Sequence, residues 1–199
     1  MQTTGKNNTV NLHGRTEPPR LVRAIVLVGL MGAGKTSVGA RLASALGVDL
    51  VDSDDEIEKA ANMKIAEIFE AHGEDEFRAG ERRVLARLMQ GEPRVIATGG
   101  GAFMDDGTRA LVKAEAVSVW LKADLDVLVS RTAGRTHRPL LNQGNPRQIL
   151  GRLIDERYPV YAQADITVIS EMGQTHESMA EKIIQGLSRE GRAFDAENA

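Results

Sequence analysis

The feature that most restricts the fold of this chain is a glycine-rich loop directly after an apolar run. Residues 29–36 read Gly-Leu-Met-Gly-Ala-Gly-Lys-Thr, which matches the pattern G-x-x-x-x-G-K-[ST], and residues 24–28 read Ala-Ile-Val-Leu-Val. A buried strand that ends in such a loop and opens a helix directs free backbone N–H groups at one point, where a polyphosphate can bind. Lys35 can reach the β- and γ-phosphates, and the hydroxyl of Thr36 suits Mg²⁺. We therefore expect a nucleoside triphosphate to bind here.

The composition excludes several other classes of protein. The 199 residues suffice for one domain with a substantial core, and the absence of cysteine excludes disulfides, thiolate nucleophiles and cysteine-ligated zinc. A net charge of −3 offers no general attraction for nucleic acid, and no apolar stretch reaches the roughly 20 residues that span a bilayer. We expect a cytoplasmic monomer with a disordered extension over 1–20, one domain over 21–190 and a flexible tail over 191–199.

Short apolar runs alternate along the chain with segments of helical periodicity. Strands are expected at 24–28, 48–52, 95–97, 116–121 and 166–169. Helices are expected from the loop to Gly47 and over about 57–69, 77–88, 106–114, 125–129, 147–163 and 179–187. The stretch 57–69 can form one helix or two short ones. Five mostly apolar strands separated by helices are typical of a parallel sheet that is covered on both faces. The sequence therefore predicts an α/β fold of this kind.

Two carboxylates follow the second expected strand. Ligands of parallel α/β sheets bind where strands end, and Asp52 and Asp54 lie at that place. Phosphoryl transfer needs a carboxylate near Mg²⁺ and a group that orients the attacking hydroxyl, and two carboxylates two residues apart can divide these tasks. The alternative is an acidic turn that only caps the next helix, a role that we expect Asp55 and Glu56 to take.

Glycines and arginines supply further candidates. Gly99, Gly100 and Gly101 follow the third expected strand, where they either allow a ligand to approach the backbone closely or form a simple turn. Arg78 lies in an expected helix and Arg157 in another, and either could be an ordinary surface charge.

Residues 133–146 interrupt the helical pattern with two glycines and two prolines. Arg131, Arg135 and Arg138 cluster at or within this segment. A basic loop of this kind can cover bound phosphates as a lid, or it can be a surface loop with ordinary solubilising charge.

Taken together, these segments resemble one family, the shikimate kinases. The matching stretches keep the family's order and spacing over about residues 22–190. They are the loop 29–37, Val51-Asp-Ser-Asp54 with Ile57-Glu58, Glu76-Phe77-Arg78, Thr98-Gly-Gly-Gly101, Arg138-Pro-Leu-Leu141 and Arg157-Tyr-Pro-Val-Tyr161. The resemblance implies a P-loop kinase fold of the nucleoside monophosphate kinase type, with a mobile lid. It also implies transfer of the γ-phosphate of ATP to the 3-hydroxyl of shikimate, in the pathway to chorismate and the aromatic amino acids.

The family's residue roles carry over by position. Lys35, Asp54 and Arg138 would be catalytic, and Thr36 and Asp52 would hold Mg²⁺. The nucleotide would contact a larger set, namely Gly32, Ala33, Gly34, Lys35, Thr36, Ser37, Arg131, Arg138 and Gln174. Shikimate would contact Asp54, Arg78, Gly99, Gly100, Gly101 and Arg157, with the two arginines at its carboxylate. Guanidinium groups suit a carboxylate because they donate two parallel hydrogen bonds.

Two departures from the family's pattern leave the phosphate and shikimate positions untouched. Family members often carry a basic residue near the adenine after the last strand, where this chain has Gln174, and the extension over 1–20 exceeds the family's usual compact start. Three other interpretations stay open from the residues: a gluconate kinase, a nucleoside monophosphate kinase and a non-catalytic nucleotide-binding module.

Overall fold

Five parallel strands form one sheet at the centre of the molecule. The computed structural model describes residues 20–133 and 144–195. The strands are β1 (Ala24–Val28), β2 (Leu50–Asp52), β3 (Val95–Ala97), β4 (Ala116–Ala123) and β5 (Ile166–Ser170). Their order across the sheet is β2-β3-β1-β4-β5, with every neighbouring pair parallel. The predicted α/β fold with a five-stranded parallel sheet is confirmed.

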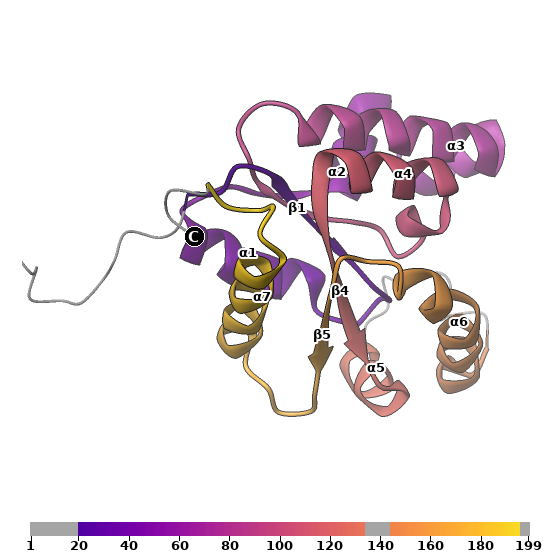
Figure 1. The fold of residues 1–199 in the computed structure, drawn as a ribbon. Coiled ribbons are helices and arrows are strands. Elements are labelled where there is room, and N and C mark those ends of the chain that lie inside the picture. The colour runs from indigo at the N-terminus through magenta and orange to yellow at the C-terminus, as the bar shows by residue number, and fades with distance from the viewer. Residues whose placement is uncertain (1–19, 134–143, 196–199) are drawn as a thin grey trace, which may run out of the picture.

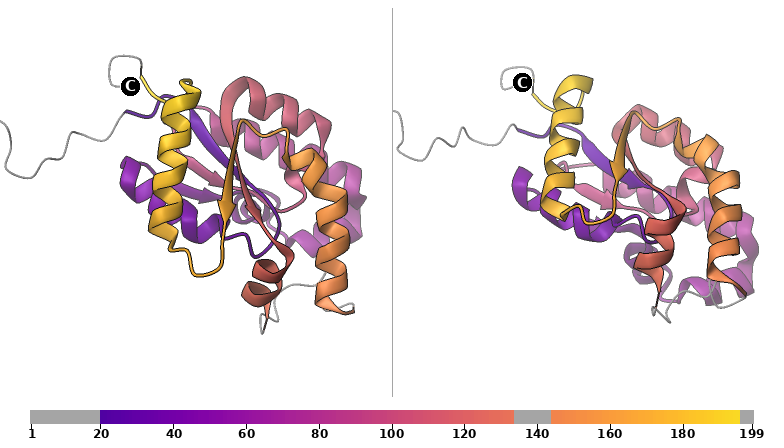
Figure 2. Two further views of the ribbon diagram at one scale, coloured as in Figure 1. Left: turned by 60° about the horizontal axis from the view of Figure 1, so that its bottom comes forward. Right: turned by 90° about the horizontal axis from the view of Figure 1, so that it is seen from below.

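Helices cover both faces of this sheet. They are α1 (Lys35–Leu46), α2 (Ser53–Ala61), α3 (Ile65–Met89), α4 (Asp106–Glu115), α5 (Leu125–Thr132), α6 (Pro146–Tyr161) and α7 (His176–Glu190), with a short 3₁₀ helix η1 (Ala102–Met104). Figure 1 shows α1 and α7 together on one side of the sheet and α3 and α4 on the other. The views in Figure 2 separate α7 from α6, which lies near the carboxyl end of β4. Among the described residues, no helix is long and apolar enough to cross a membrane.

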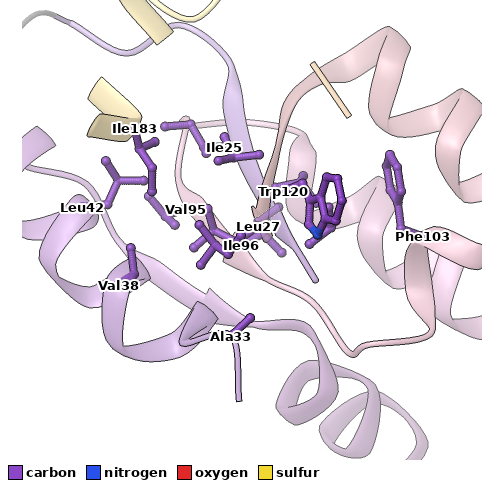
Figure 3. Packing of buried hydrophobic residues seen from close by; sticks show 14 of the residues in the cluster. Ile25, Leu27, Ala33, Val38, Leu42, Val95, Ile96, Phe103, Trp120 and Ile183 are labelled. Carbon is purple, nitrogen blue, oxygen red and sulfur yellow. The ribbon is translucent and has the colours of Figure 1, made fainter. Parts of the chain in front are cut away.

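The core lies on both sides of the central strands because their residues are apolar on both faces. All five residues of β1 are buried, as are all three of β3. Figure 3 shows Leu42 and Ile183 packed on one side of Ile25 and Val95, with Trp120 and Phe103 toward the other side. Burial on two faces is expected for a parallel strand whose crossover helices lie above and below it.

Two expected elements have different limits in the structure. The second strand is shorter than 48–52 and begins at Leu50. The helix expected over 77–88 is continuous with the end of the one expected over 57–69, and together they form α3, which bends at Gly73 with φ 76° and ψ 179°. Only glycine adopts this backbone conformation without strain. The bend brings the rings of Phe69 and Phe77 together, with 4.3 Å between their centroids.

The sequence predicts a flexible tail from residue 191 onward, but in the structure the first part of this segment packs on the domain. Ala193 and Phe194 are buried, and Phe194 forms an antiparallel bridge with Leu21. The N–H of Val22 donates to the carbonyl of Ala193, at 2.8 Å. Apolar burial and backbone pairing therefore attach residues 191–195 to the domain. Residues 1–19, most of the expected lid and residues 196–199 lie outside the described residues.

Candidate active site

The phosphate-binding loop joins β1 to α1, as the sequence predicts. Gly29, Gly32 and Gly34 all have positive φ, and a Cβ on Gly29 would lie 2.8 Å from the carbonyl oxygen of Leu121. The loop therefore needs glycine for its own conformation and its packing on β4 as well as for contact with a ligand. The ammonium group of Lys35 donates to the carbonyls of Gly29, at 2.7 Å, and of Leu30, at 3.1 Å.

Asp52 ends β2 and faces the loop. Its Oδ1 accepts a hydrogen bond from the N–H of Asp54, at 3.1 Å, and its Oδ2 accepts one from the hydroxyl of Thr36, at 3.4 Å. Asp52 itself is thus the side chain that caps α2, whereas we expected Asp55 and Glu56 to do so. The N-cap residue precedes the first helical turn, so its carboxylate can accept a hydrogen bond from a free N–H of that turn. Asp55 and Glu56 lie within the turn and make no such hydrogen bond here. The other oxygen of Asp52 stays directed at Thr36.

Asp54 lies in the first turn of α2, against the glycine run. Burial raises the pKa of its carboxyl to about 6, the charge of Asp52 adds to this rise, and the charge of Lys35 opposes it. A Cβ on Gly99 would lie 2.6 Å from Oδ1 of Asp54. The absence of a side chain at Gly99 therefore lets the carboxylate approach the backbone at the end of β3.

Arg78 projects from α3 toward the same glycine run. A Cβ on Gly101 would lie 2.5 Å from Nη2 of Arg78, so this glycine too makes room for a charged side chain. Nη1 of Arg78 donates to Glu81 at 2.6 Å, and the Glu81 side chain is only 1% exposed. Burial raises the pKa of Glu81, and the hydrogen bond from Arg78 opposes this rise. Sequence reasoning missed Glu81, although its place three residues after Arg78 on a helix is a usable signal.

Arg157 reaches the middle of the glycine run from α6. Its Nη1 donates to the carbonyl of Gly100 at 2.9 Å. The hydroxyl of Tyr161, one helical turn later, donates to the same carbonyl. Arg78 and Arg157 are 79 residues apart in sequence, and the sheet brings both to neighbouring glycines at the end of β3.

Arg131, in α5, connects the phosphate-binding loop with the end of β5. It donates to the hydroxyl of Ser170 at 2.7 Å, to the carbonyl of Glu171 at 3.1 Å and to that of Ala33 at 3.5 Å. Oε1 of Gln174 accepts a hydrogen bond from the N–H of Glu171.

A cavity of about 500 Å³ unites most of the predicted residues. Its lining contains Met31, Gly32, Gly34, Lys35, Thr36, Ser37, Asp52, Asp54, Thr98, Gly99, Gly100, Arg131 and His176. His176, which sequence reasoning missed, is part of this lining. Five of the predicted residues that the structure describes are not: Ala33, Arg78, Gly101, Arg157 and Gln174. A hollow of about 570 Å³ between α2 and α3 contains none of the predicted site residues. Arg138 lies outside the described residues.

Two kinds of ligand fit along this cavity and the glycine run at its edge. The phosphate-binding loop has the amides and the lysine that a polyphosphate requires. The glycine run lies against two guanidinium groups, of Arg78 and Arg157, and against the carboxylate of Asp54, whose pKa is raised. A phosphate donor and a small anionic acceptor can therefore lie next to each other. The fold and the site define an ATP-dependent P-loop phosphotransferase that acts on a small molecule.

Comparison with known proteins identifies the family. The model of the shikimate kinase family matches residues 31–188. A shikimate kinase from Paramagnetospirillum magneticum is 55% identical over 84% of this chain and 86% of its own length. A shikimate kinase from Cereibacter sphaeroides is 53% identical over 88% of this chain and 87% of its own length. The structure of the Acinetobacter baumannii shikimate kinase in complex with shikimate aligns with a TM-score of 0.77 at 39% identity, over 85% of this chain and 95% of that one. The chain belongs to the shikimate kinase family and is an ATP-dependent kinase of the shikimate pathway.

Proposed function

We propose that this site binds shikimate at the glycine run and transfers the γ-phosphate of ATP to its 3-hydroxyl, giving 3-phosphoshikimate and ADP. The observation that carries the proposal is the convergence of Arg78 and Arg157 on adjacent glycines next to Asp54. Guanidinium groups bind a carboxylate strongly, and a carboxylate beside free backbone amides suits an acceptor with several hydroxyls. The family membership and the shikimate complex of the Acinetobacter enzyme support the same acceptor.

Asp54 is the group that receives the proton of the attacking hydroxyl. The acceptor oxygen forms a bond to the γ-phosphorus, the bond from that phosphorus to the β,γ-bridging oxygen breaks, and ADP leaves with the electron pair. The proton passes to Asp54, whose pKa of about 6 makes it a better proton acceptor than an exposed aspartate with a pKa near 3.8. Lys35 stabilises the negative charge that spreads over the transferred phosphoryl group.

Mg²⁺ fits the oxygen atoms at the end of β2. Thr36 offers a hydroxyl and Asp52 a carboxylate oxygen, and these hard ligands suit Mg²⁺. No group of three or more acidic or histidine side chains able to hold a metal occurs within the described ranges. This matches an ion that is held by one or two protein oxygens and by the nucleotide phosphates. When bound, Mg²⁺ would neutralise phosphate charge.

The nucleotide occupies the rest of the cavity. Residues 32–37 hold its phosphates, and Arg131 and Gln174 are assigned to the adenine by family position. Arg131 and His176 line the cavity, whereas Gln174 does not. Arg138 keeps its assignment to the phosphates by family position. The cytoplasmic location and the monomeric state stay predictions from the sequence.

The acceptor assignment is tested with Arg78→Ala and Arg157→Ala, using Arg83→Ala as the control. Arg83 lies on the same helix as Arg78, is mostly exposed and pairs with Glu76 at 3.2 Å. Dissociation constants for shikimate and for a nonhydrolysable ATP analogue are measured by titration calorimetry. Loss of one partner of a desolvated charge pair costs about 2–5 kcal/mol, so we expect shikimate affinity to fall at least about 30-fold in the first two variants. Affinity for the ATP analogue should stay unchanged, and Arg83→Ala should behave as wild type.

Unchanged shikimate affinity in both site variants would refute the carboxylate contact. ADP formation with gluconate, AMP or CMP in place of shikimate tests the other acceptors, and turnover with one of these but not with shikimate would refute the proposed reaction.

A further inference from the structure

The three carbonyls of the glycine run are held in two different ways. The carbonyl of Gly99 accepts from the N–H of Ala102, and that of Gly101 accepts from the N–H of Met104, so both bonds are local turns. The carbonyl of Gly100 is held instead by side chains of α6, from Arg157 and Tyr161. The orientation of the central peptide therefore depends on a distant helix.

This dependence matters because a run of glycines has little conformational preference of its own. Gly100 and Gly101 restrict φ and ψ less than any other residues, and no side chain on either of them fixes the peptide between them. In a trans peptide the C=O and the following N–H point in opposite directions, and no described peptide bond is cis. A fixed Gly100 carbonyl thus fixes the direction of the Gly101 N–H. Within residues 20–133 and 144–195, none of the N–H groups of the three glycines donates a hydrogen bond.

Tyr161 is rigidly placed for this contact. Its side chain is fully buried, and its ring packs 6.0 Å from Trp120 of β4 and 6.3 Å from Tyr158. Burial raises the pKa of Tyr161 by more than the charges of Arg157 and Arg78 lower it. The hydroxyl therefore stays protonated and remains a donor. Packing against Trp120 and Tyr158 holds the ring in place, and the hydroxyl donates its hydrogen bond to the carbonyl of Gly100.

We propose that Tyr161 is a positioning residue of the acceptor site: its hydroxyl, together with Arg157, fixes the Gly100 carbonyl and so directs the next N–H toward the acceptor's hydroxyls. The inference rests on the proposed function, because it assumes that the acceptor binds at the glycine run. It assigns a role to a side chain that does not itself line the cavity.

The chain contains an internal control for this role. Its only two tyrosines are Tyr158 and Tyr161, and both lie in α6 beside Trp120. Each hydroxyl donates to a backbone carbonyl, but the partner of Tyr158 is Ala123, at the end of β4 and outside the glycine run. Replacing either tyrosine by phenylalanine removes one hydroxyl and keeps the ring. Tyr161 is buried and Tyr158 only half-buried, so a general loss of stability can differ between the two variants, and exchange in β4 measures that loss separately.

The experiment compares Tyr161→Phe with Tyr158→Phe in the full chain. Steady-state assays give KM for shikimate, KM for ATP and kcat, and amide hydrogen exchange of the unliganded protein is followed over residues 98–104. We expect Tyr161→Phe to raise KM for shikimate about tenfold, equivalent to about 1.4 kcal/mol, with KM for ATP within about twofold of wild type. Exchange over 98–104 should accelerate relative to β4 in this variant only. Tyr158→Phe should leave both Michaelis constants and this exchange unchanged.

Each contrary result has a distinct meaning. Wild-type KM for shikimate in Tyr161→Phe, or equal shifts for shikimate and ATP, would overturn the positioning role. The same holds if exchange over 98–104 accelerates no more than in β4, because a global loss of stability would affect both segments. Failure of the proposed function shows elsewhere, as absence of turnover with shikimate in the wild-type protein or as full shikimate affinity in both Arg78→Ala and Arg157→Ala.

Discussion

Burial beside the phosphate-binding loop raises the pKa of Asp54 to about 6 from a usual value of 3.8. An acid whose pKa is higher in the folded than in the unfolded state binds more protons when folded between pH 4 and 6. The free energy of unfolding therefore falls as pH rises through this range. Asp54→Asn should remove this penalty and raise the free energy of unfolding above pH 6 by about 1–3 kcal/mol. Because an amide cannot accept the proton, kcat should fall by orders of magnitude.

Urea unfolding at pH 4 and pH 7.5 and a coupled ADP assay check this expectation. Asp55→Asn is the control, since Asp55 is exposed in the same turn of α2. In the wild type, kcat/KM should rise with pH through about 6 as Asp54 ionises. Equal stability of Asp54→Asn and wild type at pH 7.5, or retention of wild-type kcat, would contradict the role given to this carboxylate.

At the scale of single elements, α3 contains two glycines with opposite requirements. Gly73 has φ 76° and ψ 179°, whereas Gly80 lies in regular helix, where an added Cβ would meet only Arg83 Nη2 at 3.7 Å. Gly73→Ala should lower the free energy of unfolding by about 1–3 kcal/mol through backbone strain. Gly80→Ala should raise it by about 0.5–1 kcal/mol, because alanine loses less conformational entropy in a helix.

Urea midpoints of these two variants measure the difference directly. The open space around Gly73 means that no steric clash contributes to its expected loss. If both substitutions change stability in the same direction, the bend at Gly73 does not require the left-handed backbone and α3 can straighten at little cost.

At the scale of the whole molecule, the two ends of the described chain support each other. Phe194 is 4% exposed and pairs with Leu21. Arg192 forms an ion pair with Asp165 at 2.5 Å, and Asp165 in turn accepts hydrogen bonds from Ser118 at the start of β4. A chain that ends at residue 190 should therefore lose about 3–5 kcal/mol of unfolding free energy, mainly through loss of the buried phenylalanine. A chain that ends at residue 195 keeps these contacts and should match the full-length protein.

Thermal and urea unfolding of the two truncated chains decide this point. The shorter chain should also unfold at a lower temperature, by roughly 2–4 °C for each kcal/mol lost in a protein of this size. Equal stability of both chains would mean that residues 191–195 contribute nothing beyond the domain expected over 21–190.

The local sequence pattern was sufficient to predict most strands of this protein, its sheet type and its phosphate-binding loop. The apolar run before Gly29 predicts β1 and the loop, and the alternation of strands with helices predicts a parallel sheet. These features depend on residues close together in sequence, so spacing and periodicity reveal them. The carboxyl ends of parallel strands gather ligands, which is why the order of residues alone predicts that Asp52 and Asp54 lie beside the phosphate-binding loop.

Only the tertiary structure decided which distant side chains meet. Tyr161 reaches Gly100 from α6, and Phe194 joins the core beside Leu21. Neither contact has a local signature, because both depend on how the fold brings separate elements together. The raised pKa of Asp54 has the same origin, since desolvation is a property of the folded surroundings and not of the residue.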